Sequence, residues 1–345
     1  MRFRESMGRI IDSVAAKKAH HFSNKSPDWL RKTRLDRRGS LGSFTRHGRA
    51  PMGSGRAMTF TERLRYRLEY AGFRLVQAAA TALPLEAVSL SSGIAWRLIA
   101  PRLYRQERAL RNLALAYPDM PIKERKRLAA HMWENLGRTF AESFHLKEIA
   151  AENRIRFEPE ERFDAMARGG PFVVCSLHLG NWEIIACAGK RLGIPLTGVY
   201  QRLSNPLVDA ETHKLRAFLY EGGLLPKLPV SARALLRKAQ EGGYPAFLAD
   251  LRDDRGARVP FFGHPARSST FPALLARTTG LPLYAGAAFR LPNVRFVIRA
   301  ERVPIPHTND RAADAIAGTA ALQAQFEAFI REAPEQWMWA HRRWD

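Results

Sequence analysis

The chain has 345 residues, of which 46% are hydrophobic, so it is long enough to bury a sizeable core and to form one large domain or two. Its formal net charge of +22 indicates an acidic partner such as nucleic acid, an anionic membrane or a phosphorylated substrate. The cysteines, Cys175 and Cys187, both lie in apolar surroundings, which excludes a disulfide framework and favours a reducing cytoplasm.

The basic charge is concentrated in residues 1–57, which are rich in Lys, Arg, Gly and Ser and have few periodic apolar positions. This composition predicts a mostly disordered basic arm. Met58 opens MTFTERLRYRLEYAGF, which also looks like a natural start. Residues 1–57 are therefore either a disordered basic arm or a segment that is not translated in the native protein. No signal peptide is expected, because the first apolar stretch lies far from the N-terminus and lacks a cleavage pattern.

Residues 58–150 are predicted to form helices that associate with a membrane surface. Glu86 and Arg97 limit the uncharged runs to about ten residues, whereas a helix that spans a bilayer needs roughly 20. The mixture of basic, aromatic and aliphatic side chains suits helices that lie in the membrane interface. A soluble helical region packed on its own core is the alternative.

Residues 151–345 alternate short apolar runs with helical stretches, and we expect them to fold as one unit with residues 58–150. This order predicts an α/β fold with a mixed, mostly parallel sheet flanked by helices. The last two strands are expected to pair through a turn, and Ser231 and Gly242 are expected to cap and end one helix. The predicted strands lie at 171–178, 195–201, 244–250, 282–289 and 294–303.

A histidine and a glutamate stand where the first strong strand gives way to a helix, in FVVCSLHLGNWEII. Side chains alternate along a strand, so His178 and Cys175 face opposite sides. On a continuous helix His178 and Glu183 would lie about 140° apart. They can meet if the chain turns at Gly180 and the helix begins at a cap formed by Asn181.

A neutral imidazole with a carboxylate behind it acts as a general base, because the carboxylate fixes the tautomer and stabilises the imidazolium. Such a pair suits the deprotonation of an alcohol that attacks a thioester. A buried core histidine and an unrelated glutamate at a helix start form the alternative interpretation. Metal binding is not expected, since no second ligand stands at a suitable spacing.

Four ordered stretches carry a family resemblance: HLGNWE, VYQRLSNPLVD, LADLRDDRGARVPFFGHPA and PEQWMWAHRRWD. With them the chain resembles the lipid A biosynthesis (lauroyl/myristoyl) acyltransferase family, within the lysophospholipid-acyltransferase-like superfamily, over about residues 61–345. Two departures stand out. Gln201 and Arg202 replace the family's Arg-Pro, and Leu251 stands where the family usually has Gln.

The resemblance implies a glycerolipid-acyltransferase-like fold and an O-acyltransferase. The enzyme would move a fatty acyl chain from an acyl-carrier-protein or coenzyme A thioester to a hydroxyl of a lipid A precursor. His178 would be the general base and Glu183 its orienting partner. Acyl carrier protein and an anionic inner-membrane lipid would be the partners, with no cofactor and no metal. The protein would act at the cytoplasmic face of the bacterial inner membrane, bound peripherally or by a single N-terminal anchor.

The predicted substrate-binding residues come from the matched stretches. Arg202 stands near the family's Arg and Asp250 matches its Asp. The two phenylalanines can line an acyl-chain channel or belong to the core, and the paired arginines near the C-terminus suit phosphates. The full set is Asn181, Arg202, Asn205, Asp250, Phe261, Phe262, Arg342 and Arg343.

Two other functions remain as alternatives. A lysophospholipid or other glycolipid acyltransferase would use the same chemistry on a different anionic acceptor. A basic nucleic-acid-binding protein is suggested by the net charge alone, without a helix-turn-helix, zinc-finger or aromatic RNA-binding signature. No specific nucleic acid is therefore expected as a partner.

Overall fold

The computed structural model describes residues 58–151 and 153–344. The predicted basic arm, residues 1–57, lies outside the described residues. The chain is divided after Leu68, and the sheet belongs to the second unit, Glu69–Asp345, which is compact.

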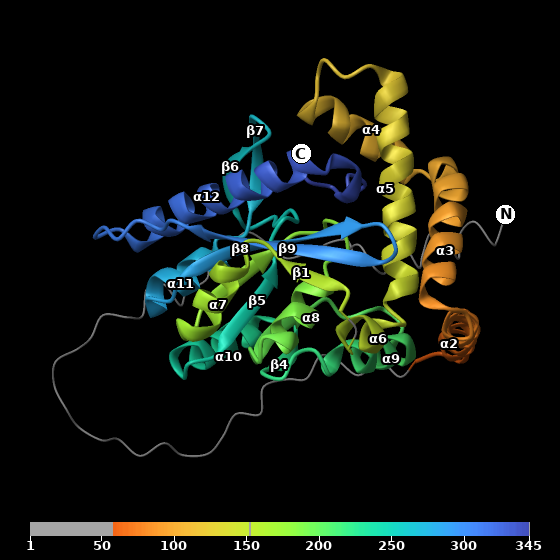
Figure 1. Cartoon of the computed structure of the whole chain (residues 1–345), viewed down its shortest axis with the longest axis horizontal. Coiled ribbons are helices and arrows are strands. Elements are labelled where there is room, and N and C mark those ends of the chain that lie inside the picture. The colour runs from red at the N-terminus through yellow and green to blue at the C-terminus, as the bar shows by residue number, and fades with distance from the viewer. Residues whose placement is uncertain (1–57, 152, 345) are drawn as a thin grey trace. The chain divides into compact units, whose positions relative to one another are not determined.

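The second unit is built around a seven-stranded sheet with the strand order β1-β9-β8-β2-β5-β3-β4 (Figure 1). All neighbouring strands run parallel except β8 and β9, which pair antiparallel. This mixed, mostly parallel sheet confirms the predicted fold class. The seven strands are β1 (Ile155–Phe157), β2 (Val173–Ser176), β3 (Leu196–Tyr200), β4 (Gly223–Pro226), β5 (Tyr244–Leu248), β8 (Leu283–Leu291) and β9 (Arg295–Val303).

Helices cover both faces of this sheet, and Figure 1 shows α12 and α8 on opposite sides. None of the described helices is both long enough and apolar enough to cross a bilayer. The α-helices are α2 (Phe60–Thr81), α3 (Leu85–Ile99), α4 (Arg105–Ala116), α5 (Ile122–Glu142), α6 (Leu146–Ala151), α7 (Glu160–Arg168), α8 (Ile184–Arg191), α9 (Pro206–Ala217), α10 (Pro229–Gln240), α11 (Phe271–Thr279) and α12 (Arg311–Glu332). Two 3₁₀ turns, η2 (Ala100–Arg102) and η3 (Pro334–Gln336), follow α3 and α12.

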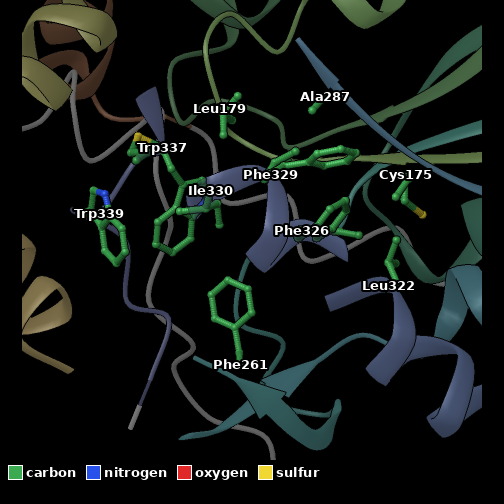
Figure 2. Packing of buried hydrophobic residues seen from close by; sticks show 14 of the residues in the cluster. Cys175, Leu179, Phe261, Ala287, Leu322, Phe326, Phe329, Ile330, Trp337 and Trp339 are labelled. Carbon is green, nitrogen blue, oxygen red and sulfur yellow. The ribbon is translucent and has the colours of Figure 1, made fainter. Parts of the chain in front are cut away.

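Strand β2 separates two hydrophobic cores, as its alternating side chains require. Val173, Cys175 and Leu177 belong to a core formed with α4, α5, α11, α12 and the C-terminal segment, part of which Figure 2 shows. Val174 belongs to a second core formed with α6, α7 and α8. Cys175 and the side of the strand that carries His178 are therefore separated, as the alternation predicts.

A two-stranded hairpin, β6 (Ala257–Phe261) and β7 (His264–Ser268), was not predicted from the sequence. Prolines occupy both strands, and Pro260 stands opposite Pro265. A two-stranded ribbon tolerates them because each strand has an unpaired edge where a missing N–H costs nothing. The hairpin presents its Phe261–Phe262 end to the core.

Two local expectations around α9 and α10 were wrong. The sequence NPLVDAETHKLRAFLYEGG reads as one helix that ends at its paired glycines, but α9 ends at Ala217 and Gly223 begins β4. Ser231 was expected to cap α10, yet this helix begins at Pro229, whose fixed φ suits the first helical turn. The Ser231 hydroxyl instead donates to the Pro226 carbonyl, at 2.6 Å. Gly242 follows the helix with φ +85°, as expected.

Helices α3 and α5 approach each other closely through two glycines. A Cβ on Gly137 would lie 2.7 Å from the Ser92 carbonyl oxygen, and a Cβ on Gly93 would lie 2.8 Å from the Arg138 side chain. Across this contact the Ser92 hydroxyl donates to the Gly137 carbonyl, at 2.8 Å. Helix α5 is thereby fixed between α3 and the residues that follow β2.

Candidate active site

The chain turns sharply after β2, and Gly180 makes the turn possible. Gly180 has φ +57°, and a Cβ at this position would lie only 1.9 Å from the Ala288 carbonyl oxygen. Both the backbone conformation and the space therefore require glycine. The predicted turn at Gly180 is confirmed, and it leaves His178 at the carboxyl end of a central strand, where open α/β sheets bind their ligands.

The C-terminal segment lies directly beside this turn. Leu179 and Trp337 form an antiparallel bridge. The Gly180 N–H donates to the Gln336 carbonyl at 3.0 Å, and the Met338 N–H donates to the His178 carbonyl at 3.1 Å. The first and last of the four sequence motifs thus form one structural unit, a contact that the sequence did not reveal.

The residue that holds the His178 ring is Asp250, at the end of the neighbouring strand β5. Oδ1 of Asp250 lies 2.8 Å from Nδ1 of His178, and Oδ2 accepts a hydrogen bond from the His178 N–H at 2.9 Å. The indole N–H of Trp337 donates to the same Oδ2, at 2.9 Å. Parallel neighbouring strands bring their carboxyl ends to one sheet edge, which explains why two residues so distant in sequence meet.

The charge state of this pair assigns the histidine tautomer. Burial alone would raise the pKa of Asp250, but the charge and hydrogen bonds of His178 lower it well below its usual value. An ionised carboxylate only accepts hydrogen bonds, so the proton must sit on Nδ1 of His178. In the neutral ring Nε2 then carries the lone pair, and it forms no hydrogen bond with any residue in the described part of the chain.

Glu183, the expected orienting partner, lies elsewhere. Its Oε1 is 3.0 Å from Nε of Arg216 in α9, and no hydrogen bond or ion pair joins it to His178 within the described residues. Glu183 directly precedes α8. Burial raises the pKa of Cys187 and of Tyr220, and the negative charge of Glu183 raises both pKa values further. The structure therefore corrects the expected pairing: Asp250, not Glu183, occupies Nδ1 of His178.

Asn181 is fully buried and engaged on both sides of its amide. Its Oδ1 accepts from the Glu183 N–H at 3.2 Å and its Nδ2 donates to Oε2 of Glu142 at 2.9 Å. The predicted cap was wrong, because Glu183 is the N-cap residue of α8 and Asn181 lies in the turn before it. Glu142 also accepts from Ser89 at 2.7 Å and pairs with Arg290. Burial would raise the pKa of Glu142, but the Arg290 guanidinium and these hydrogen bonds lower it. The predicted substrate-contact residue Asn181 thus holds the shape of the turn.

Helix α5 supplies further support for the turn. Asn135 and Thr139 both donate to the Gly180 carbonyl, each at 2.9 Å. With Glu142 these residues stand at positions i, i+4 and i+7 of the helix, so they share one face. Sequence reasoning missed them, although three polar residues with helical spacing on a helix that also carries Met132 and Trp133 are a recognisable signal.

Two aromatic rings flank His178. The ring of Trp182 lies 4.9 Å from it and that of His341 lies 5.0 Å from it, centroid to centroid. His341 is 6% exposed, and burial followed by the nearby His178 lowers its pKa well below the usual value. His341 is therefore neutral at neutral pH. Nothing in the sequence analysis singled it out.

The predicted acyl-channel residues belong to the core. Phe261 is 0% and Phe262 is 5% exposed, and their rings pack against Trp337, Trp339 and Trp344. Figure 2 shows Phe261 among the buried side chains of α12 and the C-terminal segment. The core interpretation of these two residues is the one that the packing supports.

Arg343 was expected to contact phosphate, but it is fully buried. Its guanidinium donates to the Arg267 carbonyl at 2.9 Å, to Ser268 Oγ at 2.7 Å and to Gln323 Oε1 at 3.0 Å, and it stacks over the Phe261 ring. Burial lowers the pKa of Arg343 to about 10. The residue therefore joins the β6–β7 hairpin to α12. Its neighbour Arg342 is exposed.

The remaining predicted residues lie in the loop after β3. Arg202 is exposed and forms no hydrogen bond or ion pair with another residue in the ranges that the structure describes. Asn205 caps α9 by accepting from the Leu207 N–H at 3.0 Å, and it donates to Glu69 at 3.1 Å. Neither residue is joined to His178 by any contact observed here.

The described residues contain no group of three or more His, Cys, Asp or Glu side chains that could hold a metal ion. Burial raises the pKa of both Cys175 and Cys187, so neither thiol is ionised near neutral pH. The contact between Asp250 and Nδ1 of His178 suits this histidine to proton transfer.

The mixed α/β sheet, with His178 at the carboxyl edge of a central strand, fits the acyltransferase class that the resemblance implies. The family model described as bacterial lipid A biosynthesis acyltransferase matches residues 58–345. The chain belongs to this family and is an O-acyltransferase of lipid A biosynthesis. It is similar to the lipid A biosynthesis lauroyltransferase of Escherichia coli (strain K12), with 26% identity over 248 residues, which cover 68% of this chain and 76% of that protein.

Proposed function

We propose that this acyltransferase moves a fatty acyl chain from an acyl-carrier-protein or coenzyme A thioester to a hydroxyl of a lipid A precursor. The observation that supports this most directly is the His178–Asp250 pair, which leaves Nε2 of the histidine ready to accept a proton. The family membership supports the acceptor class.

His178 acts as the general base in this proposal. Nε2 takes the proton of the acceptor hydroxyl while the oxygen attacks the thioester carbon, and a new C–O bond forms. The C–S bond then breaks, and the departing thiolate recovers the proton from Nε2 of His178. Asp250 stabilises the transient imidazolium, and this proton transfer contributes about 10²- to 10⁴-fold in rate.

The oxyanion that develops on the thioester needs hydrogen-bond donors. The Gly180 and Glu183 N–H groups already donate to Gln336 and Asn181. We propose that the backbone N–H groups of Asn181 and Trp182, together with the exposed Arg202, donate hydrogen bonds to the oxyanion. Glu183 is proposed to act indirectly, by holding the start of α8 through Arg216.

We further propose that the protein works at the cytoplasmic face of the inner membrane, attached through its N-terminal helices. Leu90, Ile94 and Leu98 lie on successive turns of α3 and are 47%, 46% and 60% exposed. This apolar stripe, with the exposed Arg97 and Arg102 nearby, suits the interface of an anionic bilayer. A lipid acceptor would be delivered at that surface.

The test is transfer by the purified full-length chain, with acyl-carrier-protein and coenzyme A thioesters as donors. A lipid A precursor and a lysophospholipid are offered as acceptors in parallel. We expect transfer to the lipid A precursor and a loss of at least about 100-fold in kcat for His178→Ala. His307→Ala, at an exposed position, serves as the matched control. Transfer to lysophospholipid alone, or normal turnover by folded His178→Ala, would contradict the proposal.

A further inference from the structure

Helix α4 brings a row of arginines to the C-terminal segment. Arg105, Arg108 and Arg111 recur every third residue, so they lie along neighbouring positions of one side of the helix. Asn112 of the same helix donates to the carbonyls of Trp339 and His341, at 2.8 and 2.7 Å. The residue that follows this anchored carbonyl, Arg342, is thereby held beside the arginines of α4.

These cations are close enough to repel one another. Burial is the first cause that lowers the pKa of Arg108, and the charges of Arg105, Arg111 and Arg342 lower it further. Within the described part of the chain Arg108, Arg111 and Arg342 form no ion pair with an acidic side chain. Arg108, Arg111 and Arg342 therefore favour the arrival of an anion.

A second observation comes from His341, which lies between this cluster and the base. Its side chain is 94% buried, because only 6% is exposed, and its Nε2 has no hydrogen-bond partner in the described structure. Its ring lies 5.0 Å from that of His178, and the charges of Arg105 and Arg108 reach it. A buried nitrogen without a partner is costly unless a ligand supplies one.

We propose that Arg108, Arg111 and Arg342 bind a phosphate group of a substrate, with His341 at the end of the site next to His178. The planar guanidinium matches a phosphate through two parallel hydrogen bonds. Arg105 is only 6% exposed and Arg108 is partly buried, so the site favours a small group that enters it over a flat acidic protein surface. This inference rests on the proposed function.

The phosphate has two possible sources in the proposed reaction. The acceptor carries phosphate on its sugars, and the donor carries a phosphate on the pantetheine arm that holds the thioester. Both would reach the neighbourhood of His178 during transfer. The binding chemistry is the same, and the experiment distinguishes the sources.

The experiment compares the full-length wild type with Arg108→Gln and Arg342→Gln. Arg237→Gln is the matched control, because Arg237 lies on α10 and its side chain is 73% exposed. In one arm the acceptor is offered with its phosphates and after phosphatase treatment. In the other arm the donor is acyl-4′-phosphopantetheine or acyl-pantetheine. We expect the wild type to show a lower KM for the phosphorylated form than for the unphosphorylated form in one of the two arms.

Each site variant should reduce that preference at least about tenfold, as expected for a lost charge-assisted hydrogen bond, with a smaller change in kcat. The arm that responds identifies the source of the phosphate. A preference that is unchanged in both arms would overturn the inference. So would a variant effect confined to carrier-protein donors, because this would indicate an acidic protein surface.

Binding of inorganic phosphate, followed by calorimetry, separates this inference from the proposed function. Binding that is lost in Arg108→Gln but accompanied by no acyl transfer would contradict the function and leave the phosphate site standing. If acyl transfer occurs but phosphate binds equally to the wild type and Arg108→Gln, the phosphate site is contradicted and the proposed function stands.

Discussion

Asp250 accepts three hydrogen bonds, from the ring and the backbone N–H of His178 and from the indole of Trp337. The first fixes the tautomer of the base, and the second fixes the backbone that carries it. The third ties the carboxylate to the C-terminal segment. A single fully buried side chain therefore sets the position and the protonation pattern of His178, the proposed general base.

Removing the charge of Asp250 and removing the charge of Glu183 should have different effects on kcat. Asp250→Asn should lower kcat by about 10²- to 10⁴-fold, because an amide cannot hold the same tautomer or stabilise the imidazolium. Glu183→Gln should lower kcat much less, because Glu183 contacts Arg216 instead of the ring. Steady-state kinetics on both folded variants provide the measurement. A severe loss for Glu183→Gln with near-normal Asp250→Asn would restore the pairing expected from the sequence.

His341 should make the free energy of unfolding depend on pH. Its folded pKa lies well below the usual 6.5, owing to burial and to the neighbouring His178, Arg105 and Arg108, with Asp250 opposing them. Below about pH 6.5 the unfolded chain takes up a proton that the folded chain refuses. Stability is therefore complete above that pH and declines as the pH falls.

The measurement is urea unfolding of the wild type and His341→Gln between pH 7.5 and about pH 5. The variant should lose part of the acid-side slope, by up to about 1.4 kcal/mol per pH unit. His307→Gln, at an exposed position, should keep the wild-type slope. An unchanged slope in His341→Gln would show that the ring is not held neutral.

The sequence predicted where His178 lies but not which carboxylate contacts its ring. The position of His178 followed from strand alternation, and the turn followed from Gly180. The contact with Asp250 depends on which strands are neighbours, and local periodicity carries no information about strand order. Arg343 was misassigned for a similar reason, because an arginine near a chain end reads as solvated unless the core around it is known.

Among the helices, α5 has the most direct influence on the active site. Its polar face carries Asn135, Thr139 and Glu142, which bind the turn after β2, while its other side meets α3 at Gly137. Ser89 of α3 donates to Glu142, so the same carboxylate joins both helices to Asn181. The turn is therefore held from the side on which α5 and α3 pack.

Removing the charge of Glu142 should destabilise the protein strongly. In Glu142→Gln the Arg290 guanidinium, 11% exposed, would lose its carboxylate, and breaking a buried pair in this way costs about 3–5 kcal/mol. Denaturant unfolding gives the value. Glu124→Gln is the matched control on the same helix, where the side chain is 50% exposed and the expected change is below about 0.5 kcal/mol. Equal effects would contradict this assignment.

The longer elements were predictable and the shortest were not. The hydrophobic runs of β2, β3, β5, β8 and β9 are continuous enough to be recognised. Strand β1 has only three residues, and β4 reads as the end of a helix because its glycine pair is an equally good helix stop. The β6–β7 hairpin was missed because its prolines argue against a strand. Proline is tolerated in edge strands, but the sequence does not show which strands lie at an edge.

Over the whole molecule the exposed apolar stripe of α3 predicts attachment to a lipid surface. Replacing Leu90, Ile94 and Leu98 with Ser should reduce binding to anionic vesicles several-fold. Each replacement removes an apolar side chain that would be buried in the apolar layer of the bilayer. Vesicle sedimentation measures the effect. Val230→Ser, at a 67% exposed position of α10, is the control and should bind normally. Undiminished binding by the triple variant would place the lipid contact elsewhere.

The three bonds at Asp250 also constrain the order of events. A carboxylate so occupied is poorly placed to take up a proton, so in the proposed mechanism Nε2 of His178 receives the proton and returns it within one turnover. Donor and acceptor must then be present together as a ternary complex, and no acylated form of the enzyme should accumulate. Double-reciprocal initial-rate plots should intersect, and parallel lines would refute this.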